Sequence, residues 1–278
     1  MRFEGEIIRS RQNRNIVELC KLFDRKARRE TELFRFDGIK LLEEAVRNGV
    51  ELRSVFLRES SASKIASFLE ERFGNSVSER LGRIFLVSDE IFERISEEKS
   101  PEGVITVAKY IDKLQKIVTI YYSADFFEMK DERIVLLESV RDPSNIGAII
   151  RSAAALGVDR LILSEDCADI YHPRAVRASM GTLFNQRVDR VADLEKAIGG
   201  LRESGRRVFA AALDDSAAIL GSFDRLTGDC VVIGNEGHGL SEKIVKACGN
   251  SVMIPMCDRA ESFNAAVAAS ILMWEFSK

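Results

Sequence analysis

The sequence predicts an α/β protein in two parts, a mainly parallel sheet flanked by helices and preceded by a smaller α/β domain. Two observations carry this prediction. Short strand-like apolar runs alternate with amphipathic helical patterns along most of the 278 residues. The alternation breaks over 109–131, where charged stretches flank one apolar run. A chain of this length accommodates two domains, which we place at 1–110 and 132–278, with 111–131 as a linker.

The elements of the first domain follow from apolar spacing. Ile16, Leu19 and Phe23 recur at helical intervals, which predicts one amphipathic helix over about 15–29. The later runs alternate between strand and helix patterns in the same way. Strands are expected at 33–36, 55–57, 83–87 and 103–107, and helices at 39–49, 65–73 and 89–95.

From residue 134 the alternation resumes and predicts the larger sheet. Strands that alternate with helices run parallel, and pockets in such sheets form beyond the carboxyl ends of the strands. Strands are expected at 134–138, 160–163, 187–191, 207–212, 230–233 and 251–255, and helices at 145–156, 173–183, 193–204, 241–248 and 262–276.

The composition argues against membrane, secreted and metal-binding proteins. No apolar run is long enough to cross a bilayer, and the first twenty residues lack a signal-peptide core, so we expect a cytoplasmic protein and no membrane partner. The five cysteines include no CxxC pair, and with only two histidines we expect no metal site. The net charge of −3 argues mildly against a general nucleic-acid coat. The basic cluster at 25–29 fits either a solvated helix face or an RNA contact.

Three strands of the second domain run into loops of small and polar residues. The strand at 231–233 enters the turn Gly234-Asn235-Glu236-Gly237-His238-Gly239. The strand at 252–256 is followed by Glu261-Ser262-Phe263-Asn264, and Asp142-Pro143-Ser144-Asn145-Ile146-Gly147 with Arg151 lies upstream. Exposed backbone groups at such strand ends can hold a nucleoside-like ligand. The loops therefore predict the walls of one pocket.

These loops, with Glu138-Ser139-Val140-Arg141 before the first of them and the segment 172–181, resemble the motifs of the SpoU/TrmH family of RNA ribose 2'-O-methyltransferases in the SPOUT class. The first domain is similar to the ribosomal-protein-like substrate-binding domain of many members, through Arg28-Arg29-Glu30, Asp37-Gly38, Glu44-Ala45 and Pro101-Glu102-Gly103-Val104. Two positions depart from the family pattern, with Phe263 in place of leucine and Asp258 in place of glycine.

The resemblance implies a function and an assembly. The fold would carry a carboxyl-terminal trefoil knot, and the cofactor would be S-adenosylmethionine. The partners would be RNA, with ribosomal RNA preferred over transfer RNA, and a second copy of the chain. In that homodimer the arginine and the cofactor site would come from different subunits.

It also implies roles for named residues. The catalytic residues would be Arg151, Asn145, Glu236, Ser262 and Asn264. The cofactor would be bound by Gly234, Asn235, Glu236, Gly237, Leu240, Ile254, Met256, Ser262, Phe263 and Asn264. RNA would be bound by Arg25, Lys26, Arg28, Arg29 and Arg177.

Plainer local roles compete with these assignments. Asn145, Ser262 and Asn264 stand at helix starts, where they could serve as caps. Arg151 lies off the buried stripe of its helix, as a solvated arginine would. Arg177 could instead form a structural ion pair. An arginine is also a poor general base because its pKa lies above about 12. We therefore expect Arg151 to position the hydroxyl and stabilise charge in an in-line transfer that needs no metal. The alternative is that Arg151 is itself the base, which requires neighbouring charges to lower its pKa.

Two other functions are consistent with parts of the pattern. A nicotinamide-dependent oxidoreductase would use a similar sheet, but the turn reads GxxGxG and not the dinucleotide fingerprint GxGxxG. A non-catalytic RNA-binding relative could keep the fold. The retained Asn145, Arg151, Glu236, Ser262 and Asn264 count against that alternative.

Overall fold

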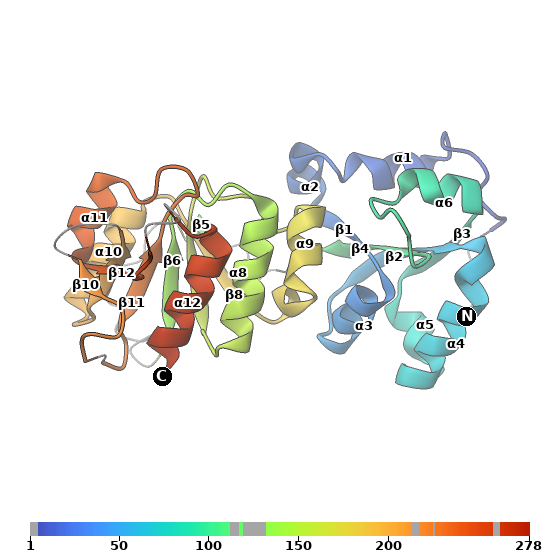
Figure 1. Cartoon of the computed structure of the whole chain (residues 1–278). Coiled ribbons are helices and arrows are strands. Elements are labelled where there is room, and N and C mark those ends of the chain that lie inside the picture. Colours follow the sequence, from blue (N-terminus) through green and yellow to red (C-terminus); the bar gives the residue numbers. More distant parts are fainter. Residues whose placement is uncertain (1–4, 112–116, 119–131, 213–216, 225, 258–261) are drawn as a thin grey trace. The chain divides into compact units, whose positions relative to one another are not determined.

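The computed structural model describes residues 5–111, 117–118, 132–212, 217–224, 226–257 and 262–278 (Figure 1). The chain divides into two compact units. The first comprises Met1–Ile111 and Tyr171–Phe184, and the second comprises Asp112–Ile170 and Asn185–Lys278. Residues 171–184, which the sequence analysis assigned to the second domain, therefore belong to the first unit. Most of the predicted linker lies outside the described residues.

The first unit is built on a four-stranded sheet in the order β1-β4-β2-β3. Strand β4 pairs antiparallel with β1 and β2, and β2 pairs parallel with β3. The strands are β1 (Leu33–Asp37), β2 (Leu52–Arg58), β3 (Arg83–Val87) and β4 (Val104–Lys109). The helices are α1 (Arg14–Lys21), α2 (Arg25–Thr31), α3 (Ile39–Arg47), α4 (Ala62–Phe73), α5 (Val77–Arg80), α6 (Asp89–Ile95) and α9 (Pro173–Ser179).

The prediction of one helix over 15–29 is wrong, because the chain turns between α1 and α2. Asp24 has an extended backbone, and its side chain accepts the N–H two residues further on. The buried guanidinium of Arg28 donates to the carbonyl oxygens of Leu22 and Phe23, both at 2.8 Å. In a continuous helix those carbonyls would accept backbone N–H groups instead.

Tyr171 joins the segment around α9 to the first unit. Its buried ring stacks on Tyr110 with centroids 4.1 Å apart and lies 4.7 Å from the ring of Phe34. Its hydroxyl accepts the backbone N–H of Ile111 at 2.8 Å. Stacked aromatic rings bury a large apolar area, so this cluster is a substantial part of the packing between α9 and β1.

The second unit contains an eight-stranded sheet in the order β10-β12-β9-β11-β6-β7-β8-β5, with every described pair parallel. The predicted fold class is confirmed, while the knot stays a prediction. The strands are β5 (Ile117–Val118), β6 (Ile134–Leu137), β7 (Arg160–Ser164), β8 (Arg187–Val191), β9 (Val208–Ala211), β10 (Ala218–Ile219), β11 (Cys230–Ile233) and β12 (Gly249–Met253). The helices are α8 (Pro143–Ala155), α10 (Leu194–Glu203), α11 (Glu242–Cys248) and α12 (Ala265–Ser277).

The middle of this sheet is covered on both faces. Every residue of β6 and of β11 is buried, as expected for strands between two helical layers. Helices α10 and α11 pack together over one apolar cluster, and α12 packs against both α8 and β11. Among the described residues, no helix has the length and apolar character needed to cross a bilayer.

Arg160 is the buried charge on which the amino end of the sheet depends. It is 1% exposed, and its guanidinium donates to Glu132 at 2.6 and 2.8 Å and to the buried carboxylate of Asp189. Hydrogen bonds from Arg160 outweigh partial burial and lower the pKa of Glu132. The Glu132 carboxylate therefore remains ionised opposite the guanidinium at neutral pH.

We expect Asp189→Ala to destabilise the protein by about 3–5 kcal/mol, because it leaves Arg160 buried with half of its compensating charge removed. Urea unfolding followed by circular dichroism measures the change. The control is Glu203→Ala at the exposed end of α10, which should change stability by less than about 0.5 kcal/mol. Equal effects of the two substitutions would contradict this account of Arg160.

Candidate functional site

The carboxyl ends of β9, β11 and β12 open onto a cavity of about 660 Å³. These strands are parallel neighbours, so their carboxyl ends reach the same edge of the sheet. The predicted cofactor-binding residues other than Asn264 line this cavity. They are Gly234, Asn235, Glu236, Gly237, Leu240, Ile254, Met256, Ser262 and Phe263.

The turn after β11 requires glycine at its first position. Backbone hydrogen bonds join Asn235 and Gly239 in both directions at 3.0 Å, which closes the turn on itself. A β-carbon at Gly234 would lie 2.4 Å from the backbone carbon of Gly239, so no larger residue fits there. The side-chain oxygen of Asn235 also accepts the N–H of Gly237 at 2.8 Å, which stiffens the turn.

A chain of side-chain amides joins this turn to two helix starts. The Nδ2 of Asn145 donates to Glu236 Oε1 at 2.8 Å, and the Oδ1 of Asn145 accepts from Asn264 Nδ2 at 3.0 Å. Three of the five predicted catalytic residues are thereby connected. Glu236 places a negative charge in the cavity turn, and Asn145 holds one of its oxygens.

Capping explains Asn264 but not Asn145. The Oδ1 of Asn264 accepts the N–H of Ala266 at 2.9 Å, so Asn264 caps α12 as one of the two sequence hypotheses proposed. At α8 the cap is Asp142, whose carboxylate accepts the N–H groups of Ser144 and Asn145. The side chain of Asn145 is thus free to reach across to Glu236.

Ser262 and Arg151 occupy different places. Ser262 is exposed, lines the cavity and stands two residues ahead of the α12 cap, so the capping hypothesis for it is wrong.

Arg151 is exposed on α8 and does not line this cavity. Within the described part of the chain, no hydrogen bond or ion pair is found for its side chain. The structure therefore leaves its guanidinium available but does not bring it to the cavity of its own chain.

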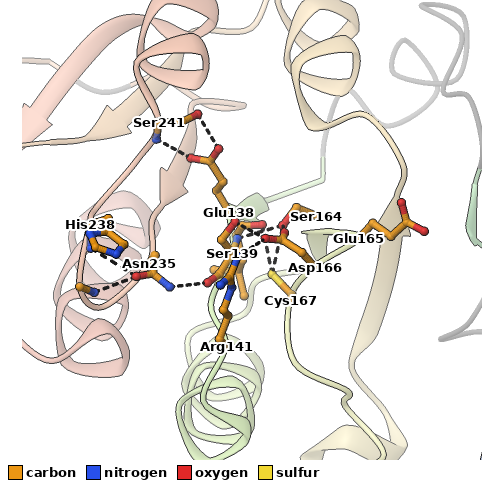
Figure 2. A network of polar contacts seen from close by, with 12 residues as sticks. Glu138, Ser139, Arg141, Ser164, Glu165, Asp166, Cys167, Asn235, His238 and Ser241 are labelled. Carbon is orange, nitrogen blue, oxygen red and sulfur yellow. Dashed lines mark hydrogen bonds and ion pairs between the residues drawn. The ribbon is translucent and has the colours of Figure 1, made fainter. Parts of the chain in front are cut away.

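A network of polar contacts lies beside the glycine turn (Figure 2). Glu138, directly after β6, accepts the backbone N–H of Ser241 at 2.8 Å and its hydroxyl at 2.6 Å. Because Ser241 caps α11, this contact fixes the start of that helix beside the glycine turn. Sequence reasoning quoted Glu138 in a motif but assigned it no role.

The predicted RNA-binding residues do not form one exposed set. Arg25, Lys26 and Arg29 are exposed on α2, and Arg177 is exposed on α9 of the same unit. The prediction that Arg28 binds RNA is wrong. Arg28 is 1% exposed, and its guanidinium donates to backbone carbonyls of the turn before α2. A buried guanidinium of this kind cannot reach a phosphate.

One of the two histidines caps a helix, and the other lies in the cavity wall. His172 caps α9, with its Nδ1 accepting the N–H of Arg174 at 3.1 Å. His238 lies in the glycine turn and lines the cavity. No group of three or more metal-ligating side chains is found among the described residues.

Sequence reasoning missed one wall of the cavity. Ala211 and Ala212 at the end of β9, and Val245 and Lys246 on α11, line it together with the predicted residues. The sequence signal that could have identified this wall is the expected strand at 207–212. Its carboxyl end lies at the same edge of the sheet as the glycine turn. Asp258 falls outside the described residues.

Comparison with known proteins identifies relatives along most of the chain. The profile of the SpoU rRNA Methylase family matches residues 132–274, and that of the MRM3-like substrate binding domain matches residues 13–106. The chain is 26% identical to the 23S rRNA (guanosine(2553)-2'-O)-methyltransferase RlmP of Bacillus subtilis, over 96% of this chain and 97% of that protein.

Two further relatives have similar descriptions. The 23S rRNA (uridine(2479)-2'-O)-methyltransferase of Streptomyces viridochromogenes is 32% identical over 70% of this chain and 67% of its own length. The crystal structure of an AdoMet-bound rRNA methyltransferase from Sinorhizobium meliloti superposes with a TM-score of 0.79 at 26% identity, covering 98% of this chain and 97% of that one.

We expect Gly234→Ala to destabilise the second unit by about 2 kcal/mol or more, because its β-carbon would collide with backbone atoms of the same turn. Thermal unfolding measures the effect. Gly237→Ala is the matched control, since its β-carbon would meet nothing closer than the Asn235 side chain at 3.5 Å. If both substitutions were tolerated equally, the close approach at Gly234 would not be a constraint.

Proposed function

This chain belongs to the SpoU rRNA methylase family, and on that premise we propose that it transfers a methyl group from S-adenosylmethionine to a ribose 2'-hydroxyl of ribosomal RNA. The observation that carries the proposal is the glycine-turn cavity with Asn145, Glu236 and Asn264 joined at its rim. The turn reads GxxGxG and not the GxGxxG that the nicotinamide alternative would use.

The cavity fits an adenosyl ligand. Its volume of about 660 Å³ lies within the usual range for small-molecule sites, and Leu240, Ile254 and Met256 offer apolar surface for a purine ring. The tight turn at Gly234 brings backbone groups to the ligand without a side chain between them. The carboxylate of Glu236 lies at the cavity and favours the positive charge of a sulfonium.

The reaction needs alignment and removal of one proton. The ribose 2'-oxygen forms a bond to the methyl carbon, the carbon–sulfur bond breaks with its electrons left on sulfur, and the hydroxyl proton passes to solvent. S-adenosylmethionine, when bound, supplies a methyl group that is already activated for displacement. The protein therefore contributes orientation, for which Asn145 holds Glu236 and Arg151 engages the hydroxyl.

We place Arg151 in the active site of a partner subunit. Its exposed position away from the cavity of its own chain supports this arrangement. Helix α12 supports a dimer, because it is apolar on nearly all sides, yet Val267 is 46% and Trp274 is 57% exposed. A second copy of the chain packed on α8 and α12 would cover this face, since symmetric interfaces pair the same surface with itself.

The first unit supplies the contact with RNA. Its exposed cations on α2 and α9 are the proposed phosphate-binding groups, namely Arg25, Lys26, Arg29 and Arg177. The relatives from Bacillus subtilis and Streptomyces viridochromogenes are both named for 23S ribosomal RNA, which favours ribosomal over transfer RNA. With ribosomal RNA as its substrate, the protein would act in the cytoplasm.

We expect purified protein to transfer tritiated methyl groups to ribosomal RNA, and Arg151→Ala to slow turnover by about a hundredfold or more because a group that stabilises developing charge is lost. Binding of S-adenosylmethionine, measured by calorimetry, should be retained. Lys196→Ala on the exposed side of α10 is the control and should leave both unchanged. Full activity of Arg151→Ala would exclude the proposed role, and labelling of transfer RNA alone would exclude the proposed substrate.

We expect two inactive variants to restore activity when mixed, if each site combines two subunits. Arg151→Ala removes the arginine, and Ile254→Trp obstructs the cavity. After subunit exchange, half of the dimers are mixed and each has one intact site, so about a quarter of the wild-type rate should return. A mixture as inactive as its components would show that each chain completes its own site.

A further inference from the structure

Ser139 has a backbone conformation that needs support. It follows Glu138 at the end of β6 and has φ 55°, in the left-handed region that residues with a β-carbon rarely adopt. The other described non-glycine residues with positive φ, Glu32 and Met180, stand at helix ends, where this conformation is common. Ser139 has no such local reason for it.

Every polar group of Ser139 is held by another segment (Figure 2). Its N–H donates to Ser164 Oγ at 2.9 Å, and its hydroxyl donates to Asp166 at 2.5 Å. Its carbonyl oxygen accepts from Asn235 Nδ2 at 2.7 Å. Contacts from other segments thus hold the left-handed backbone in place, as is common for strained residues at functional sites.

Asp166 is a rigid anchor for this arrangement. Its second oxygen accepts the hydroxyl of Ser164 at 2.6 Å. The loop that carries it is fixed from β8, because the guanidinium of Arg190 donates to the carbonyl oxygens of residues 165, 167 and 168 at 2.7–2.8 Å. Partial burial acts to raise the pKa of Asp166, but hydrogen bonds from Ser139, Ser164 and Arg141 lower it overall. The carboxylate therefore stays ionised and accepting at neutral pH.

The arrangement reaches the cavity through Asn235. The amide that donates to the Ser139 carbonyl presents its oxygen to the N–H groups of Gly237 and His238, at 2.8 and 3.3 Å. Its orientation therefore shapes the glycine turn that lines the cavity. If Ser139 relaxed to a negative φ, its carbonyl would rotate and Asn235 would lose this acceptor.

We infer that Ser139 and Asp166 are positioning residues that hold the glycine turn in the conformation that binds the adenosyl ligand. The inference rests on the proposed function and adds a support that lies outside the cavity itself. Neither residue lines the cavity, so both act through Asn235.

The first test is Asp166→Ala. Calorimetry with S-adenosylmethionine should show binding about tenfold weaker than in the wild type, which is a typical effect of one lost positioning contact. The KM for S-adenosylmethionine should rise equally, while kcat at saturation should stay within about threefold because Arg151 and Asn145 are untouched. The control is Glu165→Ala in the same loop, whose side chain points away from the network (Figure 2) and which should bind normally.

The second test separates backbone conformation from the hydroxyl contact. Ser139→Gly loses the hydroxyl but adopts positive φ freely, so binding should stay within about threefold of the wild type. Ser139→Val disfavours positive φ and should bind as weakly as Asp166→Ala. In the Ser139→Gly background, adding Asp166→Ala should cost little, because the backbone no longer needs holding.

The outcomes are distinct. Wild-type affinity in Asp166→Ala would overturn the inference, and so would equal losses in Ser139→Gly and Ser139→Val. If Asp166→Ala does not fold, the glycine and valine pair still decides between the two results. A wild-type protein that binds no S-adenosylmethionine would overturn the proposed function and this inference with it.

Discussion

The side-chain amide of Asn145 is the contact on which the site depends, because it joins three segments that lie far apart in the sequence. Its oxygen accepts from Asn264 at the start of α12, and its nitrogen donates to Glu236 in the glycine turn. A carboxylate at this position would face Glu236 with a like charge, and an apolar residue would satisfy neither neighbour. The position therefore requires a group that accepts on one side and donates on the other.

This contact is possible because helix α8 starts where it does. Pro143 occupies its first turn, and Asp142 caps it. Because Asp142 supplies the cap, the side chain of Asn145 can bond to Glu236 and orient that carboxylate. The apolar strands β6 and β11 hold α8 and the glycine turn in register, so the site inherits its geometry from the middle of the sheet.

Much of this could be predicted from the sequence, and the failures have physical causes. The six longer strands of the larger sheet were predicted to within two residues at either end, because continuous apolar runs bounded by polar loops give a strong local signal. The break between α1 and α2 depends on Arg28 reaching the carbonyls of Leu22 and Phe23, which spacing of apolar residues does not reveal. The cap of α8 was misplaced because the proline at its first turn was not used to locate the helix start.

The site likewise contains residues that the sequence identified and residues that it did not. The motif residues of the glycine turn were identified from their pattern, and the structure gathers them at one cavity. Ala211, Glu138 and Asp166 were given no role because their importance depends on which strands are neighbours, and strand order is a property of the whole sheet. Two-residue strands such as β5 and β10 are too short for any periodicity to show.

The excursion of Tyr171–Phe184 into the first unit has a consequence for how such proteins can be divided or recombined. The chain crosses between the units at three places, near residues 111, 170 and 184, so the two are interlaced and are not consecutive modules. A fragment that began at residue 132 would carry α9 and the ring of Tyr171 without β1 and Tyr110 to cover them. Replacing one substrate-recognition unit by another during evolution would accordingly require matched changes in this internal segment.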